Sequence, residues 1–304
     1  MERNINIRVI FWVLLLWVAV QPGAQQQYCN SSNRGNVGNG YHYELWTNGT
    51  GSVCMTVYGQ EAGFKTEWNN VGDFVARVGL AFDETKTASQ LGTLSADYAF
   101  TKSGVTRLAY MGIYGWTVNP LVEYYIVEDW NEWRPNYTHK GTVTLDGDEY
   151  DIMTNTQVNQ PSIKGNATFT QWWSVRKKGR QNGHVSISDH FAAWRNAGAQ
   201  LGQMYEAKLN VEGMNGGGAV DFTKATVVLS KPGQVRLPPK GDRETRAYLG
   251  NGNATGVRPC FSLNGAVAGS MPPNGPDAAV SSADRMAAGR YFLRPTMNGK
   301  VNGE

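Results

Sequence analysis

Between Tyr41 and Leu229 the sequence consists of short segments in which apolar and polar residues alternate, separated by Gly, Asn and Asp. An alternation of period two is typical of a β-strand, because successive side chains point to opposite sides of the strand. Many short strands at this spacing favour an antiparallel sandwich or barrel. We therefore predict an all-β fold for this part of the chain. The segments are YHYELW (41–46), VCMTVYG (53–59), RLAYMGIYGW (107–116), LVEYYIVEDW (121–130), TVTLDGDEYDIM (142–153), FTQWWSVRK (169–177), EAKLNVEG (206–213) and KATVVL (224–229).

One stretch of the chain has the start and stop signals of an α-helix. Ser188 or Asp189 can cap its start, His190–Ala197 form its body, and Gly198 ends it. No internal repeat is evident. The sequence therefore predicts one helix within an otherwise all-β domain.

The composition excludes several classes of chain. Charged residues make up 17% of the sequence, against about 25% in an average globular protein, and aromatic residues are frequent. Together these features exclude a coiled coil, a collagen-like chain and a disordered chain. All Trp residues precede Arg195, whereas positions 230–304 hold ten Lys and Arg against five Asp and Glu. These basic residues are scattered rather than clustered, so nucleic acid is not an expected partner.

Positions 1–24 have the pattern of a signal peptide. Arg3 and Arg8 supply a positive start, and Val9–Val20 is an apolar run that is short for a membrane span. We expect cleavage near Ala24, a secreted extracellular protein and no membrane attachment after cleavage. An uncleaved anchor is the alternative.

The last quarter of the chain differs in composition from the rest. Positions 230–243 are rich in Pro and charge and are predicted to form a linker, followed by a small basic module or tail over 244–304. Cys29 and Cys54 can pair across the N-terminal strands, which leaves Cys260 free or joined to another molecule. No Cys-x-x-Cys or clustered His pattern occurs, so no metal and no cofactor are expected.

Two predicted strands place carboxylates on faces that are otherwise polar or aromatic. Glu123 shares a face with Tyr125 in LVEYYIVEDW, and Glu206 and Glu212 share the polar face of EAKLNVEG. A concave sheet lined by Trp, Tyr and Gln suits a sugar. Two carboxylates are enough to hydrolyse a glycosidic bond, one as an acid and one as a nucleophile or base. The alternative is that these glutamates lie on a solvated sheet face, as is usual in antiparallel sheets.

Longer motifs follow one another along positions 28–229: GYHYELWTNGTG (40–51), EWNNVGDFVARVG (67–79), YGWTVNPLVEYYIVEDW (114–130), PSIKG (161–165), FTQWWSVR (169–176) and GHVSISDHFAAWRNAGAQLGQMYEAKLNVEG (183–213). In this order they closely resemble the endo-1,4-β-xylanases of glycoside hydrolase family 11. The first two resemble the family's early strands, the third its nucleophile strand and the fourth its thumb hairpin. The fifth resembles the strand after the thumb, and the last resembles the single helix that leads into the acid/base strand.

The resemblance implies a concanavalin-like β-jelly roll of two curved antiparallel sheets with one α-helix, in which 28–229 form the catalytic domain. It implies a monomeric enzyme that cleaves internal β-1,4-xylosidic bonds of xylan and xylo-oligosaccharides with retention of configuration. Glu123 would be the nucleophile and Glu212 the acid/base. Their carboxyl groups should then be about 5–5.5 Å apart, as in retaining glycosidases generally.

The same resemblance assigns further residues to the site. Asp73 would contact the acid/base, and Asp rather than Asn at this position goes with an acidic pH optimum in the family. Trp116, Trp172 and Tyr124 are interpreted as packing residues and are left out of the site. Seven residues would line the substrate cleft, with Pro161 at the thumb tip: Trp46, Tyr114, Tyr125, Pro161, Phe169, Gln171 and Trp173.

Three positions depart from the family pattern. Gln157 stands where Arg is common, Glu206 where Tyr is common, and Met214 where an aromatic residue is frequent. These departures change the expected electrostatics of the cleft but remove neither predicted catalytic group. Two other functions stay open: a carbohydrate-binding β-sandwich without activity, and a jelly-roll β-glucanase, which the PSIKG motif disfavours.

Overall fold

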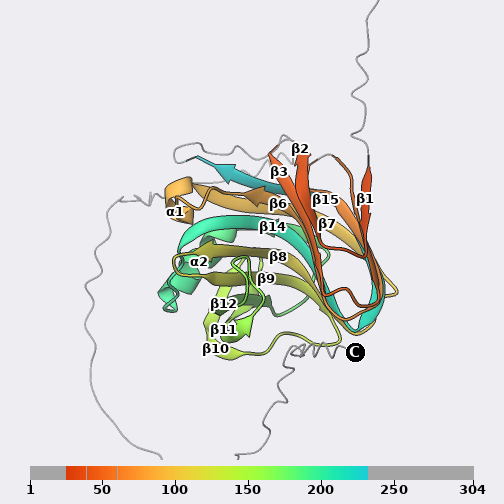
Figure 1. Ribbon diagram of the computed structural model, residues 1–304. Helices are drawn as coiled ribbons and strands as arrows, with labels where there is room; N and C mark the ends of the chain where they lie inside the picture. The colour runs from red at the N-terminus through yellow and green to blue at the C-terminus, as the bar shows by residue number, and fades with distance from the viewer. Residues whose placement is uncertain (1–24, 39, 60, 232–304) are drawn as a thin grey trace, which may run out of the picture. The chain divides into compact units, whose positions relative to one another are not determined.

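The computed structural model describes residues 25–38, 40–59 and 61–231 (Figure 1). These ranges contain all but two residues of the catalytic domain predicted over 28–229. The predicted signal peptide, Cys260, the predicted tail over 244–304 and all but the first two residues of the predicted linker lie outside them.

Fifteen described strands form two sheets, which confirms the predicted all-β sandwich. In Figure 1 the long strands β8 and β14 bend along their length. The larger sheet has the order β10 (Thr138–Leu145), β11 (Asp148–Gln160), β12 (Ala167–Arg176), β9 (Val122–Asn131), β8 (Leu108–Val118), β14 (Gln203–Met214), β6 (Phe74–Ala81), β3 (Tyr41–Thr47), β2 (Asn33–Gly38). The smaller sheet has the order β1 (Gln26–Cys29), β4 (Ser52–Val57), β5 (Phe64–Val71), β15 (Gly216–Ser230), β7 (Thr93–Ser103), β13 (Asn182–Val185).

One strand pair departs from the predicted antiparallel pattern. β12 pairs with β9 in parallel, with Gln171 beside Glu123 and Trp173 beside Tyr125. β10, β11 and β12 form an antiparallel meander that folds back onto β9, so its last strand runs in the same direction as β9. This pairing brings two of the predicted cleft residues next to the predicted nucleophile strand.

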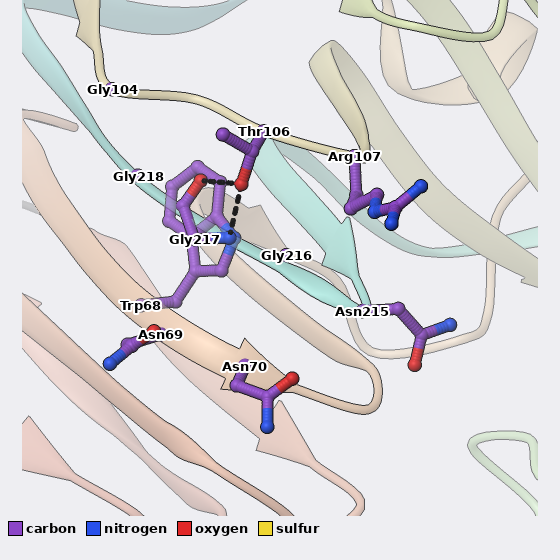
Figure 2. A pocket seen from close by; sticks show the side chains of 10 residues that line it. All are labelled: Trp68, Asn69, Asn70, Gly104, Thr106, Arg107, Asn215, Gly216, Gly217 and Gly218. Carbon is purple, nitrogen blue, oxygen red and sulfur yellow. Dashed lines mark hydrogen bonds between the residues drawn. The ribbon is translucent and has the colours of Figure 1, made fainter.

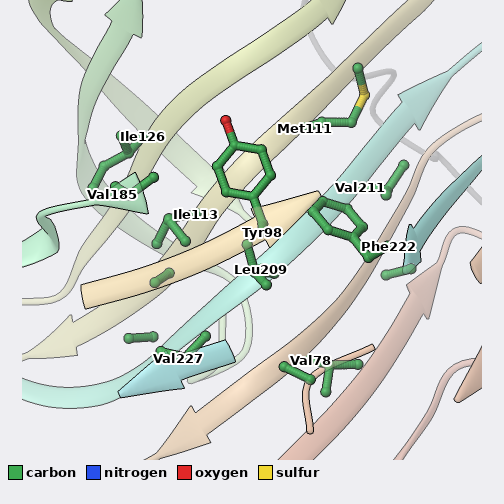
Figure 3. Packing of buried hydrophobic residues seen from close by; sticks show 14 of the residues in the cluster. Val78, Tyr98, Met111, Ile113, Ile126, Val185, Leu209, Val211, Phe222 and Val227 are labelled. Carbon is green, nitrogen blue, oxygen red and sulfur yellow. The ribbon is translucent and has the colours of Figure 1, made fainter. Parts of the chain in front are cut away.

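The main hydrophobic core lies between the two sheets (Figure 3). Leu209 and Val211 of β14 enter it beside Ile113 of β8 and Val78 of β6, and Phe222 of β15 meets them from the smaller sheet. Complete burial of one such side chain stabilises a fold by about 1.5–3 kcal/mol. The alternation predicted from the sequence therefore assigns the core-facing side of β14 correctly.

Helix α2 spans Ile187–Asn196 and starts three residues earlier than predicted. Its N-cap is Ser186, whose backbone N–H and hydroxyl both donate to the Asp146 carboxylate in the β10–β11 turn. The predicted cap Ser188 instead accepts a hydrogen bond from the Leu94 backbone. A contact with a distant turn thus sets the start of α2, and local sequence signals cannot show such a contact. A second helix of one turn, α1 (Ala88–Leu91), was not predicted.

Cys29 and Cys54 form a disulfide between β1 and β4. They lie directly opposite each other in the register of these strands. The structure therefore contains the pairing that the sequence allowed.

His190 of α2 generates a prediction about stability at low pH. Its ring is completely buried, with Nδ1 at 2.9 Å from Ser174 Oγ. Burial lowers the pKa of His190 from 6.5 to about 3, although Asp146 acts in the opposite direction. The folded protein thus excludes a proton that the unfolded chain binds below pH 6.5. We expect His190 to make unfolding easier as pH falls from 6.5 towards 3, by up to about 1.4 kcal/mol per pH unit.

Urea unfolding of wild type and His190→Gln at several pH values measures this effect. The variant should lose this part of the pH dependence whatever its stability at neutral pH. His139→Gln, at a largely exposed position, is the comparison variant that shows the general effect of replacing a His by Gln. Parallel pH profiles for wild type and His190→Gln would contradict the prediction.

Candidate active site

The larger sheet turns one face away from the core, and both predicted catalytic glutamates lie on that face. β9 carries Glu123 there, and β14 carries Glu212. Each residue is only 2% exposed. A solvated sheet face would leave such side chains open to water. The alternative interpretation of these glutamates as solvated residues is therefore wrong.

A second hydrophobic cluster covers this face, separate from the main core, and we call it the aromatic cluster. Four of the seven predicted cleft residues belong to it. Phe169 meets the ring of Trp116 edge-on, with centroids 4.8 Å apart. The members are Tyr110, Tyr114, Trp116, Tyr125, Val127, Met153, Phe169, Trp173 and Val175.

The Glu123 carboxylate is held by three neutral donors. Its Oε1 accepts hydrogen bonds from the Tyr114 hydroxyl at 2.7 Å and from the Tyr125 hydroxyl at 3.2 Å. Its Oε2 accepts a hydrogen bond from Gln171 Nε2 at 2.6 Å. The structure thus brings four of the predicted site residues into direct contact. With both oxygens engaged, the carboxylate has a fixed orientation.

Further amides fix the orientation of Gln171. Its Oε1 accepts hydrogen bonds from Asn155 Nδ2 and from Gln157 Nε2, each at 3.1 Å. Both donors come from β11, which pairs with β12. With Oε1 engaged in this way, the Nε2 group of Gln171 points to Glu123. Gln157, which departs from the family pattern, therefore takes part in the hydrogen-bond network of the site.

Trp116, which was interpreted as a packing residue and left out of the site, packs in the aromatic cluster and also belongs to the same hydrogen-bond network. Its Nε1 donates to the Tyr114 hydroxyl at 2.6 Å, and the residue lies opposite Glu123 in the register of β8 and β9. Alternation along β8 places Trp116 and Tyr114 on one face, so the sequence held the signal. Trp172 and Tyr124 lie in the main core, as predicted.

Glu212 lies on the same face as Glu123, but at a different position along the strands: it is beside Tyr110 of β8, whereas Glu123 is beside Trp116. It is opposite Tyr110 of β8 on one side and Val75 of β6 on the other. Trp46 of β3 is also opposite Val75. Asp73, two residues before Val75, is buried. Burial raises the pKa of Tyr110, and the neighbouring Glu212 charge adds to this effect. The register therefore places Trp46 and Glu212 on either side of Val75.

A series of aromatic rings connects the surroundings of Glu123 with those of Glu212. Trp173 stacks on Tyr125 with centroids 3.8 Å apart and meets Tyr110 edge-on at 6.0 Å. Tyr137 lies 5.0 Å from Trp173, and Trp133 lies 5.8 Å from Tyr137. Trp133 is 40% exposed and ends the series at the surface. Neither Tyr137 nor Trp133 was predicted to belong to the site, because both lie beyond the alternating pattern of β9.

The PSIKG motif forms a hairpin between β11 and β12, as its resemblance to a thumb implies, and we call residues 161–165 the thumb hairpin. Ser162 and Gly165 exchange backbone hydrogen bonds of 3.0 and 3.2 Å. Gly165 has φ of +81°, a conformation that favours glycine. Pro161 directly follows the last residue of β11 and begins the connection to β12 that contains this turn.

Two contacts hold the thumb hairpin. Ile163 packs against the aromatic cluster. Lys164 Nζ lies 2.8 Å from Oε2 of Glu84, in the segment that follows β6. Three strands, β9, β8 and β14, separate β12 from β6 in the sheet. The hairpin therefore spans the strands that carry Glu123 and Glu212.

A separate surface hollow of about 550 Å³ lies at the turns near one end of the smaller sheet (Figure 2). Among its described lining residues Arg107 is the only charged side chain, and no carboxylate is present. The hollow thus lacks the groups needed for glycoside hydrolysis and holds none of the predicted site residues. It is lined by Trp68, Asn69, Asn70, Gly104, Thr106, Arg107, Asn215, Gly216, Gly217 and Gly218.

We call the face of the larger sheet that carries Glu123 and Glu212 the cleft face. It holds carboxylates and two buried cations, Arg77 and Lys208. The described part of the chain contains no group of three or more His, Cys, Asp or Glu side chains suited to hold a metal ion. None of its helices has the length and apolar character needed to cross a membrane.

The family model for glycosyl hydrolases family 11 matches residues 38–223, more than half of the chain. The chain belongs to this family. The wild-type ENZbleach xylanase crystal structure is similar to it with a TM-score of 0.64 and 35% sequence identity, over 70% of this chain and 90% of that chain. The family resemblance of the sequence motifs is therefore confirmed.

Two relatives show how far the likeness extends. Endo-1,4-beta-xylanase C of Fibrobacter succinogenes is 49% identical over 199 residues, which are 64% of this chain but 32% of that protein. Endo-1,4-beta-xylanase A of Bacillus pumilus is 40% identical over 221 residues, 72% of this chain and 94% of that protein. The matched region thus spans about a third of the first relative and nearly all of the second.

The ion pair between Lys164 and Glu84 leads to a prediction about the thumb hairpin. Both side chains are partly exposed, and such a pair contributes about 0.2–1 kcal/mol. In Lys164→Met or Glu84→Gln the amide protons of Ser162 and Gly165 should exchange with solvent up to about fivefold faster. Hydrogen exchange followed by NMR measures this.

The reversed pair, Lys164→Glu with Glu84→Lys, should restore slow exchange. Lys65→Met is the control, because it breaks a similarly exposed ion pair with Glu67 in the smaller sheet. Exchange in the reversed pair as fast as in the single variants would show that the charges do not hold the hairpin.

Proposed function

We propose that the protein is a secreted endo-1,4-β-xylanase that hydrolyses internal β-1,4-xylosidic bonds of xylan with retention of configuration. The observation that carries the proposal is the buried Glu123 carboxylate, fixed by three neutral donors on an aromatic-lined sheet face. Membership of family 11 supports it, as do the two relatives named endo-1,4-beta-xylanase.

In the proposed mechanism Glu123 and Glu212 act in two displacements. Glu212 gives its proton to the glycosidic oxygen while Glu123 attacks the anomeric carbon, which yields a covalent glycosyl-enzyme and a shortened chain. Glu212, now a carboxylate, takes a proton from water, and this water displaces Glu123 from the anomeric carbon. Tyr114, Tyr125 and Gln171 hold the Glu123 carboxylate in position for both steps.

The aromatic side chains would bind the xylose units. Rings present flat apolar faces to a sugar, and Trp133, exposed at the end of the ring series, offers such a face at the surface. Trp46 and Phe169 would serve in the same way at other positions of the cleft. Pro161 and the rest of the thumb hairpin would close over the bound chain. Xylan and xylo-oligosaccharides are the proposed partners, and a monomer is sufficient for this arrangement.

Two observations support secretion. Positions 1–24 have a signal-peptide pattern, and the Cys29–Cys54 disulfide is of a kind that persists in oxidising compartments. We propose an extracellular location on this basis.

Replacement of the two glutamates tests the proposed function. Glu123→Ala and Glu212→Ala should each reduce the release of reducing sugar from xylan by at least about 10²–10⁴-fold, because each removes a group that takes part in bond cleavage. Glu149→Ala is the control, since Glu149 is exposed on β11. Binding of xylan by wild type without hydrolysis would favour a carbohydrate-binding protein. Faster hydrolysis of mixed-linkage glucan than of xylan would favour a β-glucanase.

Asp73 leads to a prediction about the pH dependence of hydrolysis. It is buried and lies one alternating position from Val75, the residue opposite Glu212. Two carboxyl groups so placed can share a proton and titrate jointly. Asp73→Asn should therefore move the acidic limb of the kcat/KM profile and the optimum to higher pH. Asp83→Asn, at an exposed position, should leave the profile unchanged. An acidic limb at the same pH in Asp73→Asn and wild type would contradict the role of Asp73 in the pH dependence.

A further inference from the structure

Four charged side chains form a group on the cleft face, and we call them the charged quartet: the partly exposed Glu44 of β3, and the buried Arg77 of β6 and Glu206 and Lys208 of β14. Arg77 Nε lies 3.0 Å from Glu206 Oε1, and Arg77 Nη2 lies 2.9 Å from Glu44 Oε2. Lys208 Nζ lies 2.7 Å from Glu206 Oε2. Glu206 thus stands between two cations, where many family members have Tyr.

Three members of the quartet are closed to water, whereas the Glu44 side chain is 20% exposed. Arg77 and Lys208 are each 3% exposed, and Glu206 is 0% exposed. Burial opposes ionisation of Glu206, but the charges of Arg77 and Lys208 outweigh it and lower the pKa of this carboxyl. Two positive and two negative charges balance. Such a group adds little stability over apolar residues of the same volume, so its position is its more informative property.

Arg77 lies directly beside the network that holds Glu123. Its guanidinium carbon is 4.9 Å from the centre of the Tyr114 ring. The Tyr125 ring meets the same ring edge-on with centroids 4.9 Å apart. Arg77 and Tyr125 therefore both restrict the Tyr114 ring, whose hydroxyl donates to Glu123.

A glycine opposite Lys208 leaves room for the Lys208 side chain. Gly79 of β6 lies opposite Lys208, and a Cβ at this position would come within 2.6 Å of Lys208 Cα. Without a side chain there, Lys208 reaches Glu206 from β14 while Arg77 reaches it from β6. The two cations thus hold Glu206 from two strands, and Glu206 with Glu44 fixes the Arg77 guanidinium.

We propose that Arg77, fixed by Glu206 and Glu44, is a positioning residue that holds the Tyr114 ring in place and thereby orients the Glu123 carboxylate. The inference rests on the proposed function. A cation over an aromatic ring attracts it, and the attraction is stronger where water is excluded. Arg77 touches no reacting atom, so its effect passes through Tyr114.

A double-mutant cycle tests this route. Arg77→Met should lower kcat on xylo-oligosaccharides by about ten- to a hundredfold, with a smaller change in KM, because a misplaced group mainly affects the chemical step. Tyr114→Phe should lower kcat as well. If Arg77 acts through the Tyr114 hydroxyl, Arg77→Met should have little further effect in the Tyr114→Phe protein. Independent, multiplicative losses would overturn the inference.

A second pair of variants separates positioning from charge balance. Arg77→Met leaves Glu206 with a single cation and should lower the melting temperature, and the addition of Glu206→Gln should restore it. The double variant should keep the low kcat, since the cation over Tyr114 is still missing. Recovery of kcat together with the melting temperature would show that Arg77 serves charge balance alone.

A second substitution of Arg77 is available if the first variant does not fold. Should Arg77→Met fail to fold, Arg77→Lys takes its place, because Lys keeps the charge but lacks the planar group that contacts two carboxylates and a ring. Arg77→Lys should then show the kcat loss, and wild-type kcat in this variant would overturn the inference.

A wild-type protein that does not hydrolyse xylan would overturn the proposed function itself, whereas an active wild type with an additive cycle would overturn the role of Arg77 only.

Discussion

Neither face of β14 is open to water, and much of the site depends on this. Its odd-numbered residues Leu209 and Val211 enter the core, while Glu206 and Glu212 on the other face are equally buried. A buried polar group costs free energy unless a neighbour satisfies it. In a sheet, such neighbours come from the adjacent strands. The strand order therefore selects the strand that supplies the partner: Arg77 of β6 lies opposite Asn210, and its long side chain reaches diagonally to Glu206.

The same rule explains how β9 is held. It carries Glu123 on the cleft face and Glu128 on the core face, and both are buried. Glu128 accepts hydrogen bonds from Tyr98 of the smaller sheet and Tyr150 of β11, and it pairs with Arg180. This fixes the strand from the core side and limits its movement relative to both sheets. A carboxylate that must meet an anomeric carbon repeatedly in one geometry benefits from such a fixed strand.

The sequence predicts what depends on neighbours along the chain. Alternation assigns Glu123 and Tyr125 to one face of β9, and the motif order identifies the family. Contacts between distant residues are not accessible in this way. Arg77 and Glu206 are 129 positions apart and meet only because β6 pairs with β14. The start of α2 depends likewise on the turn at Asp146, far along the chain.

The two carboxylates nearest to Tyr114 receive different kinds of donor, and the difference fits different tasks. Glu206 forms ion pairs with Arg77 and Lys208, in which both partners carry a charge. Glu123 receives only hydroxyl and amide donors. A cation in direct contact with Glu123 would hold its electron pair and weaken it as a nucleophile. Placing Arg77 over the ring of Tyr114, rather than against Glu123, orients the carboxylate without neutralising it.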